Sequence, residues 1–232
     1  PARFGGRLSS VIDVRTNDGD MQKYHGTFSI GLLTSKINLE GPIIKGKTSF
    51  NISARRSYLD LLAKPFMPDD EKYSYYFYDM NAKINHKFSD RSRMFLSAYH
   101  GKDHFAADYD GNTDFKDRSN MGWGNTIVSA RWNYIFNNRL FSNTTVSYNN
   151  YLFDVNAYTN NQYSTGAGAI ILNRYSSNYH SGITDWSYQI DFDYNPTPAH
   201  HIKFGTGYLF HRFQPDVTTS VISDKTDNRI DR

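Results

Sequence analysis

Oxygen-bearing side chains recur at every second position in one stretch of the chain, a pattern that can bind calcium. These residues are Asp108, Asp110, Asn112 and Asp114. Carboxylate and amide oxygens at this spacing are the ligands of a calcium-binding loop. Such a loop usually has glycine at its sixth position and a bidentate glutamate at its twelfth, where this chain has Thr113 and Ser119. The stretch therefore predicts either a calcium site or a solvated acidic loop.

Histidines near the end of the chain are a second set that could bind a metal or haem. They are His200, His201 and His211. Neighbouring residues in a β-strand point to opposite faces, so the first two cannot share a ligand on one face. We therefore interpret these histidines as interfacial or lumen-lining rather than as a ligand set.

Tyrosines are frequent between residues 158 and 185, where asparagine, serine and glycine are also common. Tyr163, Tyr175 and Tyr179 either stack on a substrate at a pore mouth or belong to an ordinary tyrosine-rich loop. No nucleophile, base and orienting group recur at a spacing that suggests catalysis. The chain has no cysteine, which excludes disulfides and thiolate chemistry. We predict that the protein is not an enzyme.

A hairpin from Tyr75 to Lys102 shows which elements must position these residues. Its first arm, Tyr75 to Phe88, alternates apolar and polar side chains, and Ser89 to Ser92 form the turn. Alternation places one face of a strand in an apolar medium and the other in water. The arm exceeds the roughly 5–6 residues of an ordinary strand and the roughly 9–11 that cross a bilayer at a tilt. The hairpin therefore predicts membrane-spanning strands.

The composition agrees with strands that meet lipid on alternate residues. The chain of 232 residues is 38% apolar and 16% aromatic, yet its mean hydropathy is −0.66. It contains no run of eighteen apolar residues, so membrane-spanning helices are excluded. The formal net charge is only +3 and the basic residues are scattered, which argues against a nucleic-acid partner.

Connections between the alternating segments are short and long in turn. Short connections are expected at 42–47, 89–92, 137–138 and 196–199, and long ones at 60–72, 103–120 and 158–185, with a further link from Gln214. A phase slip at 33–35 is interpreted as a turn. This order predicts an all-β, antiparallel, up-and-down transmembrane barrel with about nine strands here, short periplasmic turns and long extracellular loops. A soluble sandwich or propeller is the alternative, but the strands are too long for a sandwich and no propeller repeat is found.

The alternation also predicts which residues face lipid and which face the lumen. Residues expected to face lipid are Tyr76, Met80, Ile84, Val128, Trp132, Ile190 and Phe192. Residues expected to face the lumen are Asp79, Lys83, Arg131, Asp191 and Asp193.

Six segments of the chain carry recognisable motifs, at residues 2–14, 24–26, 39–42, 55–58, 76–83 and 88–91. Together these motifs resemble a TonB-dependent outer-membrane receptor of the Bacteroidetes type. The resemblance implies a plug domain inside a barrel of about 22 strands. It assigns residues 1–22 to the last strand and end of the plug and residues 23–232 to the N-terminal part of the barrel. The chain is accordingly expected to be a piece of a longer protein whose leader and remaining strands lie elsewhere.

The resemblance further implies import of a nutrient across the bacterial outer membrane. Its partners would be outer-membrane lipid and the inner-membrane TonB energising complex, the latter through a segment not present in this sequence. The chain departs from the Gly-Ser-Arg-type plug motif of the glycan-importing subfamily, so a surface lipoprotein partner and the substrate stay open. The alternative function is a structural barrel subunit of a secretion, assembly or adhesion complex.

Charged residues near the start suggest how a plug would be held. Arg7 and Arg15 flank the expected plug strand, and wall carboxylates such as Glu40 and Asp79 are available to pair with them. Paired charges in a narrow lumen are screened less than surface ones. The expectation is therefore a plug–barrel contact through Arg7, Arg15 and Glu40; the alternative is that both arginines are solvated.

Overall fold

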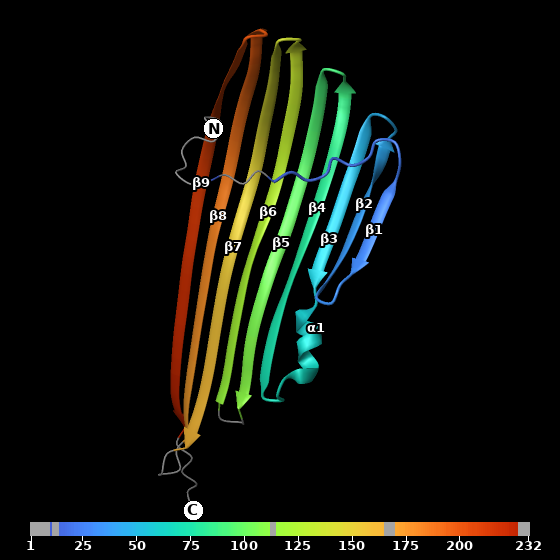
Figure 1. Ribbon diagram of the computed structural model, residues 1–232. Helices are drawn as coiled ribbons and strands as arrows, with labels where there is room; N and C mark the ends of the chain where they lie inside the picture. The colour runs from blue at the N-terminus through green and yellow to red at the C-terminus, as the bar shows by residue number, and fades with distance from the viewer. Residues whose placement is uncertain (1–9, 11–13, 112–114, 165–169, 227–232) are drawn as a thin grey trace, which may run out of the picture.

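Nine antiparallel strands form one sheet in chain order, each hydrogen-bonded to the next (Figure 1). The computed structural model describes residues 10, 14–111, 115–164 and 170–226. The strands are β1 His25–Ile30, β2 Thr34–Ile44, β3 Thr48–Ser57, β4 Glu71–Ser89, β5 Ser92–Gly111, β6 Phe115–Asn137, β7 Leu140–Ser164, β8 Ile170–Thr197 and β9 His200–Thr226. The predicted all-β fold with antiparallel up-and-down strands is confirmed.

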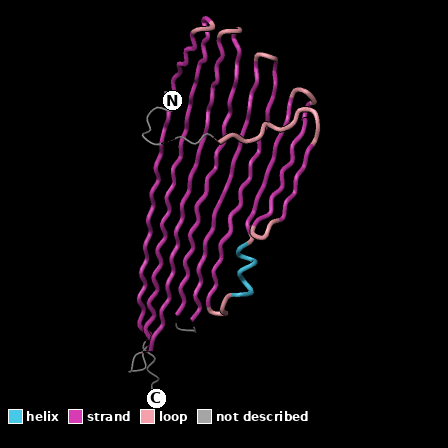
Figure 2. Tube along the Cα trace, viewed as in Figure 1, coloured by secondary structure: helices cyan, strands magenta, loops and turns pink. Residues whose placement is uncertain are grey.

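Short helical turns occupy the connection between β3 and β4. They are α1, Leu59–Ala63, and the 3-10 helix η2, Lys64–Phe66 (Figure 2). Neither of these described helices has the length and apolar character that a bilayer crossing requires. The sequence predicted only a long link here, and this connection is indeed longer than the tight turns.

Tight turns join the strand pairs where the sequence predicted short connections. The turns between β2 and β3, β4 and β5, β6 and β7, and β8 and β9 lie together at one end of the sheet (Figure 1). Gly46 supplies a positive φ of 74° in the first of them. In the third, the Asn137 side chain accepts hydrogen bonds from the backbone N–H groups of Arg139 and Leu140 at 2.9 and 3.1 Å. The phase slip at 33–35 is likewise the turn between β1 and β2, as predicted.

Two of the predicted long loops are wrong, because most of their residues continue the strands. In the stretch 103–120, β5 and β6 stay in register from Asp103 opposite Trp123 to Gly111 opposite Phe115. In the stretch 158–185, β7 and β8 pair out to Ser164 and Ile170. The link expected from Gln214 is also strand, since β9 runs to Thr226. Backbone pairing does not require alternating apolar residues, so the alternation in the sequence ended before the hydrogen-bonded ladder did.

The two faces of the sheet carry the two predicted sets of side chains. Met80, Val128 and Trp132 are about half exposed, at 51%, 49% and 48%, on what we call the open face. The opposite face carries the predicted lumen set, and there Arg131 and Lys83 both lie over the ring of Phe95, at 4.4 and 5.5 Å from its centroid. The predicted facing is therefore correct, although contact of the open face with lipid stays a prediction.

A segment near the N-terminus crosses the opposite face of the sheet. Residues 16–22, which we call the strap, run across the strands toward β1 rather than along them (Figure 1); we call the face they cross the strap face. Ser49, Asn85 and Lys83 are 0%, 0% and 7% exposed beneath or beside them. Phe95 is the one large apolar residue that is buried among the described residues. The best-buried region of the molecule is thus polar.

Candidate functional site

The strap takes its shape from local hydrogen bonds and one close approach to the sheet. The Asn17 side chain accepts the Gly19 N–H at 3.3 Å, and Asp20 accepts the N–H groups of Gln22 and Lys23 at 2.6 and 3.2 Å. Gly19 has φ +78°, and a Cβ there would lie 2.3 Å from the carbonyl oxygen of Phe50. Only glycine permits both this conformation and this approach.

Asp20 remains ionised because backbone donors point at it. The Gln22 N–H is the largest cause that holds the pKa of this carboxyl below its ordinary value, followed by the His25 side chain and the Lys23 N–H. His25 lies 2.9 Å from Asp20. The Asp20 carboxylate thus connects the end of the strap to His25, the first residue of β1.

Lys83 of β4 makes the central contact between the sheet and the strap. Its ammonium donates to the carbonyl oxygen of Thr16 at 2.9 Å and pairs with the Asp18 carboxylate at 2.5 Å. A buried ammonium is costly unless it is paired and hydrogen-bonded. The strap supplies both partners, so the position of Lys83 and the position of the strap depend on each other.

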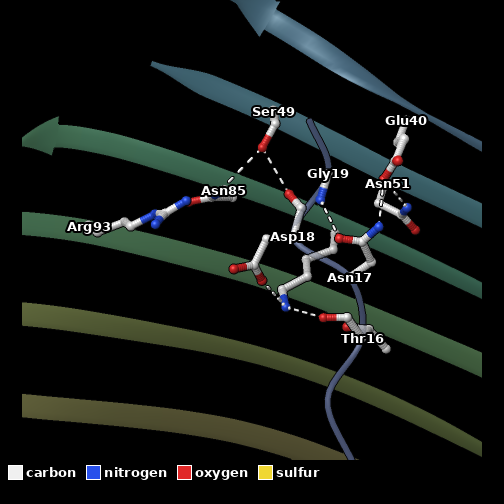
Figure 3. Close-up of polar contacts among 10 residues, drawn as sticks. Thr16, Asn17, Asp18, Gly19, Glu40, Ser49, Asn51, Asn85 and Arg93 are labelled. Carbon is white, nitrogen blue, oxygen red and sulfur yellow. Dashed lines mark hydrogen bonds and ion pairs between the residues drawn. The ribbon is translucent and has the colours of Figure 1, made fainter. Parts of the chain in front are cut away.

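Glu40 and Ser49 make two further contacts with the strap (Figure 3). On β2, Glu40 accepts the Asn17 amide at 2.7 Å and the Asn51 amide of β3 at 3.1 Å. On β3, the Ser49 hydroxyl donates to the carbonyl oxygen of Asp18 at 2.8 Å. The strap is therefore held by strands β2, β3 and β4 through polar groups.

Ser49 is supported in turn by a chain of hydrogen bonds within the sheet. The Asn85 amide donates to the Ser49 hydroxyl at 3.3 Å, and the Arg93 Nε donates to the Asn85 carbonyl oxygen at 2.7 Å. Arg93 also lies 5.2 Å from the centroid of the Phe95 ring. This chain orients Ser49 toward the strap, and Figure 3 shows it reaching from β5 to Asp18.

The predicted plug–barrel contact through Arg7, Arg15 and Glu40 stays a prediction, and the structure describes only two of the three residues. Arg7 lies outside the described residues. Arg15 is exposed and directly precedes the strap. Glu40 accepts a hydrogen bond from the strap through Asn17. The ion pair of Lys83 with Asp18 has the opposite polarity to the one expected, because the cation is on the wall and the carboxylate is on the strap. The division into a plug up to residue 22 and a barrel from residue 23 stays a prediction.

Paired charges line the rest of the strap face. Arg55 and Asp79 form an ion pair at 2.6 Å, and Tyr75 donates to Asp103 at 2.9 Å. Farther along the sheet, Asp193 contacts both His201 and Lys203, at 2.9 and 3.2 Å. The expected lumen-facing Asp79 and Asp193 therefore each have a basic partner on the strap face.

The histidines do not come together as a ligand set. His201 pairs with Asp193, His211 pairs with Asp185 at 2.6 Å, and His200 instead contacts Thr197 at 2.9 Å. Within the described residues no cluster of three or more His, Asp or Glu side chains could hold a metal ion. The three histidines thus have separate partners.

The calcium prediction falls partly on residues that the structure does not describe. Asn112 and Asp114 lie outside the described residues, and Asp108 and Asp110 lie in β5 rather than in a loop. Asp110 pairs with Lys116 of β6 at 3.2 Å. A calcium ion would have to compete with this lysine for Asp110, and the site stays a prediction.

The three tyrosines expected at a pore mouth belong to strands β7 and β8. The backbone of Tyr163 pairs with Ile171. Tyr175 and Tyr179 are 43% and 37% exposed, and Tyr179 packs edge-on against Phe153 at 6.0 Å. Tyr175 and Tyr179 are four residues apart on β8, so their side chains lie on the same face of the sheet. Contact of these tyrosines with a substrate stays a prediction.

Sequence reasoning missed most of the strap contacts, although weak signals were present. Asn17, Asp18, Gly19 and Asp20 form a turn-like run, and Lys83 was placed on the correct face. Neither observation indicates that residues 17–20 contact Lys83. These residues are far apart in the sequence, with strands β1, β2 and β3 between them.

Comparisons with known proteins give two remote structural likenesses. No protein-family model and no curated protein sequence matches this chain. The ferric yersiniabactin uptake receptor FyuA from Yersinia pestis is 11% identical with a TM-score of 0.38, over 80% of this chain and 34% of that one. The siderophore receptor PirA from Acinetobacter baumannii is 9% identical with a TM-score of 0.26, over 90% of this chain and 40% of that one. The chain thus spans well under half of either receptor, and likenesses this low define neither a substrate nor a partner.

Proposed function

We propose that this chain is part of a TonB-dependent transporter that imports a nutrient across the bacterial outer membrane. The observation that carries the proposal is the division of one sheet into an apolar open face and a polar face crossed by the strap. A wall strand of a transporter needs both, because one side meets lipid and the other meets an aqueous lumen with a plug.

The height of the apolar band supports a membrane location. On β8 the outward aromatic and aliphatic residues extend from Trp186 to Tyr194, and on β9 from Phe210 to Ile202. At about 3.3 Å per residue this is roughly 26 Å along the strand, or about 20 Å along the bilayer normal at a tilt of about 40°. Outer-membrane barrels have an apolar band of about 25 Å.

The free sheet edges set a requirement on the complete protein. In the described sheet, β1 and β9 are the outermost strands. Unpaired backbone groups in lipid cost several kcal/mol each, so the wall must continue beyond both edges and close. The proposal therefore includes a larger barrel, in line with the resemblance in the sequence.

The strap is proposed to be the end of the plug, at the point where the chain enters the barrel wall. Its contacts with β2, β3 and β4 are polar, through Asn17, Asp18 and the Thr16 carbonyl. The net free energy of such contacts over contacts with water is small, about 1 kcal/mol for a neutral hydrogen bond and about 1.5–3 kcal/mol for one to a charged group. Such an attachment can hold a plug and still yield to a pull from the TonB complex, which would engage a segment outside this sequence.

Uptake by intact cells tests this function. Cells that produce the full-length protein are compared with a deletion strain for accumulation of radiolabelled iron chelates, vitamins, oligosaccharides and peptides. We expect one class to accumulate only in producing cells and only while the inner-membrane proton gradient is intact. If no class does, and the deletion instead impairs secretion or surface assembly, the protein is a structural barrel subunit.

A further inference from the structure

Three cations gather around one phenylalanine ring on the strap face. The Lys83 ammonium of β4 lies 5.5 Å from the centroid of the Phe95 ring. The guanidinium carbons of Arg93 on β5 and Arg131 on β6 lie 5.2 and 4.4 Å from the same centroid. An aromatic ring attracts a cation within about 6 Å of its centroid. We call these three side chains the cation cluster, and Phe95 beneath them is only 5% exposed.

The register of the sheet holds the two arginines of the cation cluster close together. Phe95 lies opposite Arg131, and Arg93 lies opposite Asn133, which is two residues along β6 on the same face. Arg93 and Arg131 are therefore diagonal neighbours on adjacent strands, with Cβ atoms about 7 Å apart. Long side chains reach across this distance, so one small group between the two guanidinium groups can contact both.

One carboxylate balances the charge of the cation cluster in the described part of the chain. Asp18 pairs with Lys83 at 2.5 Å. The Arg93 Nε donates to the neutral Asn85 oxygen at 2.7 Å, which leaves the terminal nitrogens of Arg93 available (Figure 3). No hydrogen bond or ion pair joins Arg131 to another described residue, and its Nε is buried without an acceptor. A buried cation needs a hydrogen-bonded counter-charge, so the two arginines lack an anion.

The donors of the two arginines match an oxyanion. A guanidinium that lies with its face on an aromatic ring keeps its N–H edge free for hydrogen bonds. Carboxylate and phosphate groups offer two or more oxygens at the spacing of this edge, and such bidentate contacts are among the strongest hydrogen bonds in proteins. The same charges would repel a metal ion or an amine. The arginine pair therefore selects an anion.

We propose that Arg93 and Arg131 bind the carboxylate or phosphate group of a small solute. That the solute arrives through the lumen rests on the proposed function, in which the strap face lines the transport path. Arg93 directly follows Ser92, the residue that begins β5 after its tight turn. Tight turns of outer-membrane barrels are periplasmic. The pair is accordingly a site that an anionic solute meets as it leaves the barrel for the periplasm.

Phosphate binding by the full-length protein tests the site. The purified protein in a neutral detergent at low ionic strength is dialysed to equilibrium against radiolabelled inorganic phosphate. Arg131→Gln should weaken phosphate binding about ten-fold, because it removes one charge-assisted contact. Arg91→Gln removes the same charge from an exposed residue of the turn, two residues before Arg93, and should bind like the parent. Equal binding by the two variants would overturn the site.

A conservative variant shows whether the contact depends on geometry as well as charge. Arg131→Lys retains the positive charge but loses the planar fork of donors. It should bind phosphate more weakly than the parent and more tightly than Arg131→Gln. If Arg131→Lys bound phosphate as tightly as the parent, a bidentate contact at this residue would be wrong.

Crystals of the full-length protein locate the bound anion. Soaking them in sodium selenate, whose selenium scatters anomalously, should place a peak within hydrogen-bonding distance of both Arg93 and Arg131. A carboxylate from a part of the protein outside this sequence, bound to the pair in place of selenate, would contradict the proposal. So would a selenate peak at the pair combined with unchanged phosphate binding in Arg131→Gln, which would mark an adventitious ion only.

Uptake measured on the same variants separates this proposal from the proposed function. The parent should accumulate a solute that carries a carboxylate or phosphate group, and Arg131→Gln should accumulate it more slowly than Arg91→Gln does. Equal energy-dependent uptake by the two variants would overturn the solute site and leave transport standing. Phosphate binding that depends on Arg131, in a parent that shows no uptake, would overturn transport and leave the anion site standing.

Discussion

Strands β3 and β4 have polar side chains that are buried on one face and apolar side chains that are exposed on the other. On the strap face, Ser49, Asn85 and Lys83 are almost fully inaccessible and polar. On the open face of the same strands, Ile52, Ile84 and Met80 are 45%, 41% and 51% exposed and apolar. A water-soluble sheet shows the reverse arrangement, with apolar residues covered and polar residues exposed. The comparison teaches that burial within this chain does not account for the apolar residues of the open face, whereas the lipid contact required by the proposed function would.

The largest expected effect comes from a charge on the open face. Ile190→Lys should destabilise the full-length protein in a bilayer by about 2–4 kcal/mol if the residue lies near the bilayer midplane. Gln189→Lys places the same charge on the neighbouring, strap-face residue and should have a much smaller effect. Unfolding by urea in liposomes measures both. Equal effects would mean that the two faces do not differ in environment.

Breaking the central strap contact should have the next largest effect. Lys83→Met removes the cation that serves Asp18 and the Thr16 carbonyl, contacts that contribute about 1.5–3 kcal/mol for hydrogen bonds to a charged group. Amide hydrogen exchange across residues 16–22 should accelerate by roughly ten-fold or more, because each 1.4 kcal/mol is a factor of ten. Lys87→Met, which removes only the turn pair with Asp90, is the control. Unchanged exchange in the Lys83 variant would show that the strap is held elsewhere.

A smaller effect is expected from the close approach at Gly19. Gly19→Ala introduces a Cβ into a backbone with φ +78° and against the Phe50 oxygen. Gly46→Ala meets a similar φ of +74° but has only the Gln22 amide nitrogen at 3.9 Å. Both variants carry about 1–2 kcal/mol of left-handed strain. Gly46→Ala can disturb only the far end of the strap, because the Gly46 N–H donates to the Met21 carbonyl oxygen at 2.9 Å. Hydrogen exchange at residues 16–20 should therefore rise more in Gly19→Ala than in Gly46→Ala; equal exchange in the two would refute the close approach.

The smallest effect should be the acid response of the end of the strap. Because the pKa of Asp20 is depressed in the folded protein, its contribution is complete above the ordinary value of 3.8 and is lost as the pH falls through the lower folded value. Exchange of the Gln22 and Lys23 amides, corrected for intrinsic rates, should be steady from neutral pH to about pH 5 and rise only below 3.8. Asp20→Asn should remove this component. A rise that begins well above pH 5 in the parent would contradict the assignment to Asp20.

Alternation along the chain was a reliable guide where one face of a strand is apolar and the other is polar. The predicted turns at 89–92 and 137–138 correspond to the observed hairpin turns, and the facing of Met80, Val128 and Trp132 is correct. The facing of each side chain is determined by the alternation, because a shift of the register by one residue would move every side chain to the other face of the sheet. The hairpin turns are equally local, as the Asn137 side chain shows.

The same reasoning failed where neither face of a strand is predominantly apolar. The outer parts of β5 to β9 contain polar residues on both faces, so the sequence carries no periodic signal, and those stretches were predicted as loops. The ladder continues there because each strand presents its backbone groups to a neighbour already in register, for example Asp108 opposite Arg118. Once the hairpin has formed, extending it closes no new loop in the chain.

The sequence by itself determined the strand order, the hairpin turns and the facing of each strand, because all three depend on residues close together in the chain. Tertiary structure alone decided where the strap lies. The sequence correctly placed Asp18 in a turn-like segment and Lys83 on one face of a strand. Their ion pair depends in addition on the folding of β1, β2 and β3 between them and on the close approach of Gly19 to Phe50. A contact between polar residues so far apart has no periodicity, and its partners are selected only when the folded sheet brings them within hydrogen-bonding distance.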